Sequence, residues 1–342
     1  MSSIKDIAKT IKTTPEIVSG VFNYDSSISI DDTQKKDIVK ASMDAEIEIL
    51  KDYKKNYHFK KKVCFGIVGS YPEERVLNNQ FYLFVSMAIS KLCKLDKIQT
   101  VEINVLDNGF YFKKEQKIDG VFAIGKFSDK QLENLELISD NIIFIDSSPK
   151  PSKFDSILVN TQLGTLQALQ YLFKLGHKKI AFLGGISING QKELDWFYRS
   201  ESTYIEFMKS HNIFDSSLLY EGKEISFFEG ERLTTQILID HKELPSAFFV
   251  CNDTMAMGVL TRLKEYEIKV PEKVSLIGFN NIPSVKFLNP PLTTVNIPME
   301  FIAVNAIEIL VKRVLKLVNF PRTLYSPTKL VIRESTKTYR HR

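Results

Sequence analysis

The polar residues with the clearest chemical potential follow short apolar runs, at points where strands would end. Asp146 follows IIFI, Asn252 and Asp253 follow AFFVC, and Asn280 follows SLIGF. Asparagine amides both donate and accept hydrogen bonds, which suits a ligand with neighbouring hydroxyl groups. Ligands of doubly wound sheets bind beyond the carboxyl ends of the strands. These four positions are therefore candidates for a small-molecule site.

Motifs for catalysis and for tight cofactor binding are missing from the sequence. Neither GxxxxGK[ST], HExxH nor GxSxG occurs, and the glycines of GGISING (184–190) lack the spacing of a dinucleotide-binding loop. The five histidines are dispersed, and Cys64, Cys93 and Cys251 have no metal-like spacing. We therefore expect a protein that is not an enzyme and that uses no cofactor and no metal.

The elements that must position these residues alternate between strand-like and helix-like patterns from about residue 63 to residue 281. The runs VCFGIVG, NIIFID and KKIAFLGG are typical of buried parallel strands, and stretches such as TQLGTLQALQYLFKLG have helical length. This order predicts an α/β architecture with doubly wound parallel sheets.

The first fifty residues have a different, all-helical pattern. Ser3 followed by Asp6 indicates a capping box, and Thr14 followed by Pro15 indicates the start of a second helix. A third helix is expected from about residue 33 to residue 50. Two short helices held by a third would form a small module that presents one face to another molecule.

Composition and charge set further limits. The chain is 44% hydrophobic and 25% charged, which is typical of a soluble globular protein, and it has no run of 18 apolar residues. The start lacks the apolar segment of a signal peptide, so we expect a cytoplasmic protein with reduced thiols. The net charge is +5, and six lysines lie between Lys51 and Lys62. This segment is either a solvated linker or a flexible arm that lies near phosphates.

These features together resemble the LacI/GalR family of bacterial transcription regulators over nearly the whole chain. SIKDIAKTIKTTPEIVSGVFN (3–23) resembles the family's helix-turn-helix opening, and YLFKLGHKKIAFLGG (171–185) is similar to its strand-helix signature. The most specific block spans residues 248–301, where N-D, V-P, V-S, I-G-F and P-L-T-T follow in the family's order. AIGKFSDKQLENL and IIFIDSSP resemble the branch that responds to galactose or galactosides.

The resemblance implies an all-α helix-turn-helix headpiece at 1–50, a basic hinge at 51–61 and a two-lobed core at 62–342 that is similar to periplasmic binding proteins. We expect lobe one to comprise 62–159 and 289–321, and lobe two to comprise 160–288 and 322–342. The expected assembly is a homodimer, since no heptad run that would pair dimers follows TKLVIREST.

The resemblance also assigns the contacts with double-stranded operator DNA. The second helix of such a headpiece enters the major groove, where base contacts choose the sequence and phosphate contacts set the register. Gly20 replaces the family's usual arginine, and Lys12 replaces its turn glycine, which costs stability if that position needs a positive φ. We expect a headpiece that folds but binds its operator more weakly, or reads an unusual one. The base-reading positions are Pro15, Glu16 and Gly20, and the phosphate-contacting positions are Thr14, Ser19, Asn23 and Thr33.

The hinge departs from the family pattern as well. Family members form a short helix whose leucine wedges into the minor groove. In this chain we favour a basic tether that holds the headpiece near phosphate, and the alternative is that Tyr57 or Phe59 acts as the wedge.

For a small sugar effector, the resemblance points to the strand-end residues and to three further side chains. Asn252 is favoured as a ligand contact and Asp253 as the N-cap of the following helix. Asn280 is equally suited to a turn, and the alternative role of Asp146 is to make structural hydrogen bonds that cross between the lobes. Arg199 lies one residue from the family's arginine position, and a surface ion pair is its alternative. The aromatic residues are equally suited to core packing. The candidate effector residues are Asp146, Arg199, Asn252, Asp253, Asn280, Phe81 and Trp196.

The resulting hypothesis is a sugar-responsive repressor of a galactose or galactoside utilisation operon, which binds operator DNA as a dimer and is released by the sugar. The main alternative is a sugar sensor whose DNA binding is weakened or lost. A secreted sugar-binding protein for transport is opposed by the missing signal peptide, and an enzyme by the missing catalytic motifs.

Overall fold

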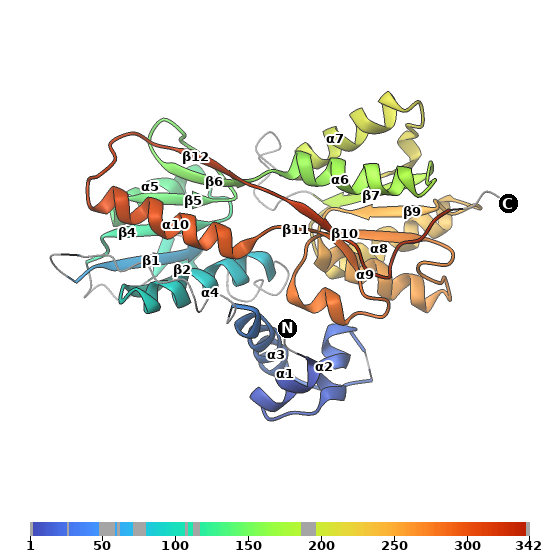
Figure 1. Ribbon diagram of the computed structural model, residues 1–342, viewed down its shortest axis with the longest axis horizontal. Helices are drawn as coiled ribbons and strands as arrows, with labels where there is room; N and C mark the ends of the chain where they lie inside the picture. The colour runs from blue at the N-terminus through green and yellow to red at the C-terminus, as the bar shows by residue number, and fades with distance from the viewer. Residues whose placement is uncertain are drawn as a thin grey trace. The chain divides into compact units, whose positions relative to one another are not determined.

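The chain divides into two compact units in the computed structural model (Figure 1). We call residues 62–159 and 298–326 the first lobe, and residues 160–297 and 327–339 the second lobe. Residues 3–46 are the headpiece, which belongs to the same compact unit as the second lobe. The structure describes residues 3–25, 27–47, 59, 62–70, 80–106, 109–111, 117–185 and 196–339.

The headpiece consists of α1 (Ile4–Thr10), α2 (Pro15–Phe22) and α3 (Asp32–Ile47). The predicted capping box is confirmed: Ser3 Oγ accepts from the Asp6 N–H at 3.2 Å, and the Asp6 carboxylate accepts from the Ser3 N–H at 2.8 Å. Thr14 caps α2 and Pro15 occupies its first turn, also as predicted. The side chains that pack between the helices are at most 2% exposed: Ile7, Ala8, Val18, Phe22 and Ile38.

The turn between α1 and α2 needs a left-handed residue. Lys12 has a φ of 56° there, a conformation that glycine adopts without a Cβ penalty. The cost that the sequence predicted for Lys12 therefore applies, at about 1 kcal/mol.

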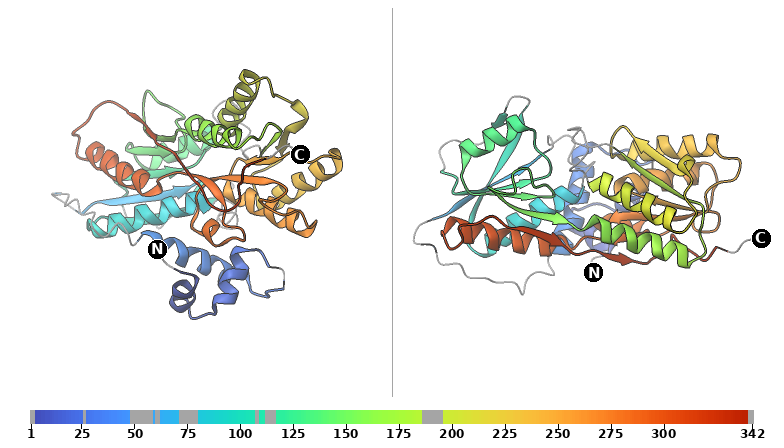
Figure 2. Two further views of the ribbon diagram at one scale, coloured as in Figure 1. Left: turned by 45° about the vertical axis from the view of Figure 1, so that its right-hand side comes forward. Right: turned by 90° about the horizontal axis from the view of Figure 1, so that it is seen from above.

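The described part of the first lobe contains a seven-stranded sheet in the order β12-β6-β5-β4-β1-β2-β3. Neighbouring strands are parallel except for the edge pair β2 and β3. Helices cover both faces of the sheet (Figure 2), which explains why β4 and β5 are apolar throughout. The elements are β1 (Cys64–Gly69), α4 (Gln80–Leu95), β2 (Gln99–Leu106), β3 (Gly109–Tyr111), β4 (Gly120–Ile124), α5 (Asp129–Ile138), β5 (Ile142–Ile145), β6 (Asp155–Val159), α10 (Met299–Val314) and β12 (Thr323–Ser326).

The described part of the second lobe contains a six-stranded sheet in the order β13-β11-β10-β9-β7-β8, parallel except for β11 and β13. The expected doubly wound parallel architecture is thus present in both lobes. The elements are α6 (Thr161–Lys174), β7 (Ile180–Gly185), α7 (Trp196–Ser210), η4 (Ser216–Leu218), β8 (Leu219–Gly222), α8 (Phe227–Asp240), β9 (Ala247–Val250), α9 (Asp253–Glu265), β10 (Ser275–Asn280), η5 (Pro283–Phe287), β11 (Thr293–Asn296) and β13 (Lys329–Val331).

The crossings between the lobes lie at 159/160, 297/298 and 326/327. The first agrees with the expected division, whereas the expected boundaries at 288/289 and 321/322 are too early. The reason is strand pairing: β11 pairs with β10 in the second lobe, and β12 pairs with β6 in the first. Because both strands have only four residues, the sequence did not indicate which of the two sheets each strand joins.

Helices α8 and α9 of the second lobe approach each other through glycine. A Cβ atom on Gly258 would lie 2.0 Å from the carbonyl oxygen of Phe227, and one on Gly230 would lie 2.2 Å from that of Met255. Real Cβ atoms do not approach backbone this closely, so both positions need glycine.

We expect Gly258→Ala to destabilise the second lobe by about 1–3 kcal/mol, because the helices must separate to admit the methyl group. The better helix propensity of alanine, about 1 kcal/mol, offsets only part of this cost. Urea denaturation followed by circular dichroism measures the change. Gly69→Ala is the comparison, since no atom lies within 4 Å of its added Cβ. Equal midpoints for the two variants would contradict the close crossing.

Among the described residues, none of the helices combines the length and the apolar character that crossing a lipid bilayer requires.

Candidate functional site

The amino end of α2 carries the predicted base-reading positions. Thr14 and Glu16 are exposed, and Pro15 and Ser19 are half-buried. Thr14 Oγ1 accepts from the Ile17 N–H at 3.4 Å, so its hydroxyl caps the helix. A hydrogen bond from its own backbone N–H, and one from the Thr14 hydroxyl, lower the pKa of Glu16. A negative charge therefore sits on the exposed start of this helix at neutral pH.

Gly20 lies in a covered position rather than on an open face of α2. It is buried, and a Cβ atom there would lie 1.8 Å from Cδ1 of Ile28. The arginine that the resemblance places at this position would therefore have to displace the Ile28 side chain.

The predicted phosphate contacts have two different environments. Thr33, in the first turn of α3, is exposed. Asn23 ends α2, and its Nδ2 donates to the carbonyl oxygens of Ser19 at 2.8 Å and Phe287 at 3.3 Å. Its Oδ1 accepts from the Asn289 N–H at 3.2 Å. The Asn23 amide is thus bonded to the second lobe.

The hinge prediction falls mostly outside the described residues. Tyr57 lies there, as do most of the lysines between residues 51 and 62. Phe59 is described and is half-buried.

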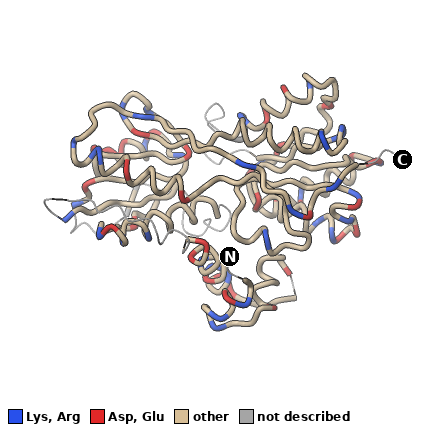
Figure 3. Tube along the Cα trace, in the orientation of Figure 1, with Lys and Arg blue, Asp and Glu red and all other residues tan. Residues whose placement is uncertain are grey.

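The headpiece carries charges of both signs (Figure 3). Residues 3–46 contain six lysines and no arginine, against six aspartates and two glutamates, which gives side-chain charges of +6 and −8. A module with this balance gains little from general attraction to phosphate, so the lysines of the hinge would have to supply that attraction.

In the second lobe, the carboxyl end of β10 turns through two left-handed asparagines. Asn280 has a φ of 112° and Asn281 a φ of 59°. The Asn281 amide is fixed on both sides, since Nδ2 donates to Asn296 Oδ1 at 2.8 Å and Oδ1 accepts from Arg333 Nη2 at 2.7 Å. Arg333 follows β13, so the segment after that strand holds the end of β10 where Asn280 lies.

At the neighbouring strand end the helix cap is Asn252 rather than the expected Asp253. Asn252 is the N-cap of α9, with Oδ1 accepting from the Met255 N–H at 2.8 Å. Asp253 is fully buried, and its carboxylate accepts from the Thr294 hydroxyl at 2.6 Å and the Ile282 N–H at 2.9 Å. The capping role favoured for Asp253 was therefore wrong, because α9 begins one residue earlier than expected.

Burial dominates the electrostatics of Asp253. It raises the pKa of this carboxyl to about 7, although the hydrogen bonds from Thr294 and Ile282 lower it. A titratable group therefore lies beneath the two strand ends that carry the candidate effector residues.

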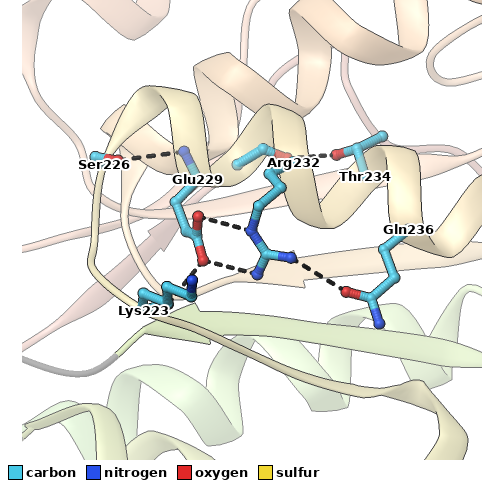
Figure 4. Close-up of polar contacts among 7 residues, drawn as sticks. Lys223, Ser226, Glu229, Arg232, Thr234 and Gln236 are labelled. Atoms are coloured by element: carbon cyan, nitrogen blue, oxygen red, sulfur yellow. Dashed lines mark hydrogen bonds and ion pairs between the residues drawn. The ribbon is translucent and has the colours of Figure 1, made fainter.

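The turn after β8 is held by a carboxylate that the sequence analysis did not select (Figure 4). Glu229 Oε1 accepts from the Lys223 N–H at 2.7 Å, and Arg232 binds both carboxylate oxygens, at 2.8 and 2.9 Å. Ser226 caps α8 through the Glu229 N–H at 3.2 Å. This network fixes residues 223–226 at the carboxyl end of a strand, where ligands of such sheets bind. The three-residue spacing of Glu229 and Arg232 was the available signal.

Gly185, the second glycine of GGISING, has a packing role at the same edge. A Cβ atom on Gly185 would lie 2.2 Å from the carbonyl oxygen of Glu224. The end of β7 therefore needs glycine to admit the turn after β8.

The two remaining second-lobe candidates lie on α7. Arg199 is half-buried, and no hydrogen bond or ion pair joins its guanidinium to a residue that the structure describes. Trp196 is the first residue of this helix, but its side chain lies outside the described part of the chain.

In the first lobe, Asp146 follows β5 with a φ of 68° and is 8% exposed. Tyr82 donates to Asp146 Oδ2 at 2.7 Å, and Phe81 packs beside Tyr82 with ring centroids 5.6 Å apart. The adjacent Ser147 hydroxyl donates to the carbonyl oxygen of Gly125 at 2.5 Å. The hydrogen bond between Tyr82 and Asp146 lies within the first lobe, so it is not the lobe-crossing bond expected as the alternative role, and Phe81 is buried.

Two doubly wound lobes joined by three crossings, preceded by a capped helical headpiece, form a core with the architecture of periplasmic binding proteins. Residues 169–336 match the periplasmic binding protein-like domain. The solved transcriptional regulator CelR in complex with cellobiose has a similar fold, with a TM-score of 0.68 and 20% identity over 98% of this chain and 100% of that one. The solved lac repressor dimer bound to operator and the anti-inducer ONPF has a TM-score of 0.64 and 20% identity. The match covers 81% of this chain and 95% of that one.

Similarity over the full length then identifies the family. The chain is 30% identical over 337 residues to the HTH-type transcriptional regulator GanR of Bacillus subtilis (strain 168), covering 98% of this chain and 99% of that protein. The chain therefore belongs to the LacI/GalR family of HTH-type transcriptional regulators. The predictions of fold class, family and a non-enzymatic role are confirmed.

Proposed function

We propose that this regulator is a sugar-responsive repressor of a galactose or galactoside utilisation operon, acting in the cytoplasm as a dimer and released from its operator by the sugar. The full-length match to a transcriptional regulator carries the proposal. The complex of CelR with cellobiose and the lac repressor dimer on its operator support a sugar effector and a dimer. Galactose is supported by residues 123–135 and 142–149, which resemble the galactose-responsive branch.

In this proposal the start of α2 enters the major groove. Pro15 and Glu16 face base edges with Gly20 behind them, and Thr14, Ser19, Asn23 and Thr33 contact phosphates. Glu16 can accept from a cytosine amine but repels phosphate, so its charge favours selectivity over affinity. The lysines between residues 51 and 62 supply the counterion release that the headpiece lacks.

The sugar contacts are assigned to both lobes. Asn280, Arg199 and Asp146 bind hydroxyl groups, and Phe81 and Trp196 are the aromatic candidates for the sugar's C–H face. Asn252 and Asp253 hold the strand ends from which these contacts are made. The sugar can change operator affinity by at most the ratio of its affinities for the DNA-bound and the DNA-free forms.

We expect the full-length protein to retard duplex DNA from the promoter region of its own operon at low salt. The logarithm of the affinity should fall with the logarithm of the salt concentration, with a slope of about one per phosphate neutralised.

Galactose or a galactoside should weaken operator binding by about 5–150-fold, the usual range of allosteric coupling. Titration calorimetry with the same sugars measures the effector affinity directly, and glucose, which differs at one hydroxyl centre, is the control. Unchanged operator affinity across a galactoside panel would contradict the effector assignment.

A sugar sensor with weakened or lost DNA binding is the second candidate. The side-chain charges of +6 and −8 in residues 3–46 and the covered position of Gly20 favour it. Sugar binding without any retardation of promoter DNA at low salt would select this candidate.

A further inference from the structure

The end of α2 is attached to the second lobe by two aromatic stacks. Phe22 stacks on Phe287 with ring centroids 5.3 Å apart and planes at 12°, and Tyr24 stacks on Phe227 at 3.7 Å and 14°. Phe287 also packs against the apolar core of the headpiece. Aromatic pairs of this kind add about 0.5–1.5 kcal/mol beyond the area that they bury.

A polar contact lies between these two stacks. Asn23 uses Nδ2 to reach the Phe287 carbonyl oxygen and Oδ1 to accept from the Asn289 N–H. Three consecutive headpiece residues, 22 to 24, thus contact the second lobe. The Tyr24 backbone is left-handed, with a φ of 49°, which is uncommon for a residue other than glycine, asparagine or aspartate.

A second headpiece element fixes the orientation. Glu46 near the end of α3 forms an ion pair with Lys286, and both side chains are 20% exposed. Contacts from α2 and from α3 together leave the headpiece little freedom to rotate on the second lobe. We call Phe227, Lys286, Phe287 and Asn289 the docking surface.

We propose that the docking surface holds the headpiece in a self-inhibited state that competes with operator DNA. The proposal rests on the proposed function, because it uses Asn23 as a phosphate contact. In the docked state both polar groups of that side chain are bonded to the second lobe. A phosphate and the loop at residues 287–289 therefore cannot hold Asn23 at the same time.

This competition makes operator affinity depend on docking. If only the undocked headpiece binds DNA, the apparent dissociation constant is the intrinsic one divided by the undocked fraction. Weakening the docking surface should then tighten DNA binding, although the substituted residues lie outside the proposed DNA contacts.

The ion pair gives the sharpest test, performed on the full chain. Lys286→Glu places two carboxylates together and should favour the undocked state by roughly fivefold. Simple electrostatics predicts weaker DNA binding for this variant, since it loses two units of positive charge. Release from docking predicts up to about fivefold tighter binding, so the two effects have opposite signs. The double variant Glu46→Lys/Lys286→Glu keeps the wild-type net charge, re-forms the pair and should return to the wild-type affinity.

Fluorescence anisotropy with promoter DNA at fixed low salt reads the affinity, and hydrogen–deuterium exchange of the peptide covering residues 15–25 reads docking without DNA. Lys286→Glu should exchange faster in this peptide, and the double variant should not. Tyr24→Ala is the second variant. Tyr24 is not part of the headpiece core, so its loss spares that core, and it should loosen docking about threefold to tenfold.

Unchanged exchange in both single variants would overturn docking. Weaker DNA binding by Lys286→Glu without recovery in the double variant would overturn the competition. A third outcome is that hydrogen–deuterium exchange of residues 15–25 rises in Lys286→Glu and returns to the wild-type rate in the double variant, while no form of the protein binds promoter DNA. That outcome would refute both the competition and the proposed function, and would leave docking as a structural contact only.

Discussion

Asp253→Asn should remove a dependence of stability on pH that the wild-type protein shows between pH 4 and pH 7. The carboxyl has a pKa of about 7 in the folded chain against 3.8 in the unfolded one. Between these values the unfolded chain releases the proton while the folded chain keeps it, so the free energy of unfolding falls as pH rises. A shift of this size corresponds to about 4 kcal/mol, fully present below the unfolded pKa and lost above pH 7.

Asparagine suits this test because it can keep both contacts. Its oxygen can accept from the Ile282 N–H while its amide donates to the Thr294 hydroxyl, which can rotate to accept. Urea unfolding of both proteins from pH 4 to pH 8 should show the variant gaining stability relative to wild type as pH rises. Asp140→Asn, a change of an exposed aspartate, controls for the loss of one carboxyl. A stability difference that stays constant across this range would refute the assignment.

Asp155→Ala should destabilise the first lobe by about 3–5 kcal/mol, because it leaves two partly buried cations without their anion. Asp155 is 1% exposed at the start of β6. It accepts from Arg313 Nε at 2.9 Å, from the Arg322 N–H at 2.9 Å and from Arg322 Nε at 3.2 Å. One carboxylate thus joins β6 to the end of α10 and to the segment before β12.

A second carboxylate in the same lobe provides the comparison. Glu136 binds Lys150 at 2.6 Å and Lys153 at 2.8 Å, but these lysine side chains are 43% and 51% exposed. Water can solvate the two lysines after Glu136→Ala, so this substitution should lower the free energy of unfolding by less than about 1 kcal/mol. Circular dichroism during urea unfolding measures the free energy of unfolding of both variants. Similar losses for the two variants would show that burial does not decide the cost.

The features that the sequence predicted correctly depend on neighbouring residues. The capping box of Ser3 and Asp6, the cap at Thr14 and the apolar strands all follow from patterns within a few residues. The positive φ of Lys12 was raised only as a condition, and only because the resembling family has a glycine there.

The features that the sequence could not predict depend on long-range contacts. Asp155 contacts arginines 158 and 167 residues away, and no local pattern links them. The docking of Asn23 on Phe287 spans 264 residues. The cap falls on Asn252 and not on Asp253 because α9 begins one residue earlier than expected, and this leaves the Asp253 carboxylate to accept from Thr294 and Ile282.

The return of the chain to the second lobe has a consequence for biosynthesis. Arg333, which fixes Asn281, and Ser335, whose hydroxyl donates to the Leu276 carbonyl oxygen at 2.6 Å, are translated after every described strand of both sheets. The headpiece helices can form early on the ribosome, whereas neither lobe can complete its sheet until residues beyond 320 have emerged. A message truncated before codon 333 would therefore yield a folded headpiece without the contacts that Arg333 and Ser335 supply to the second lobe.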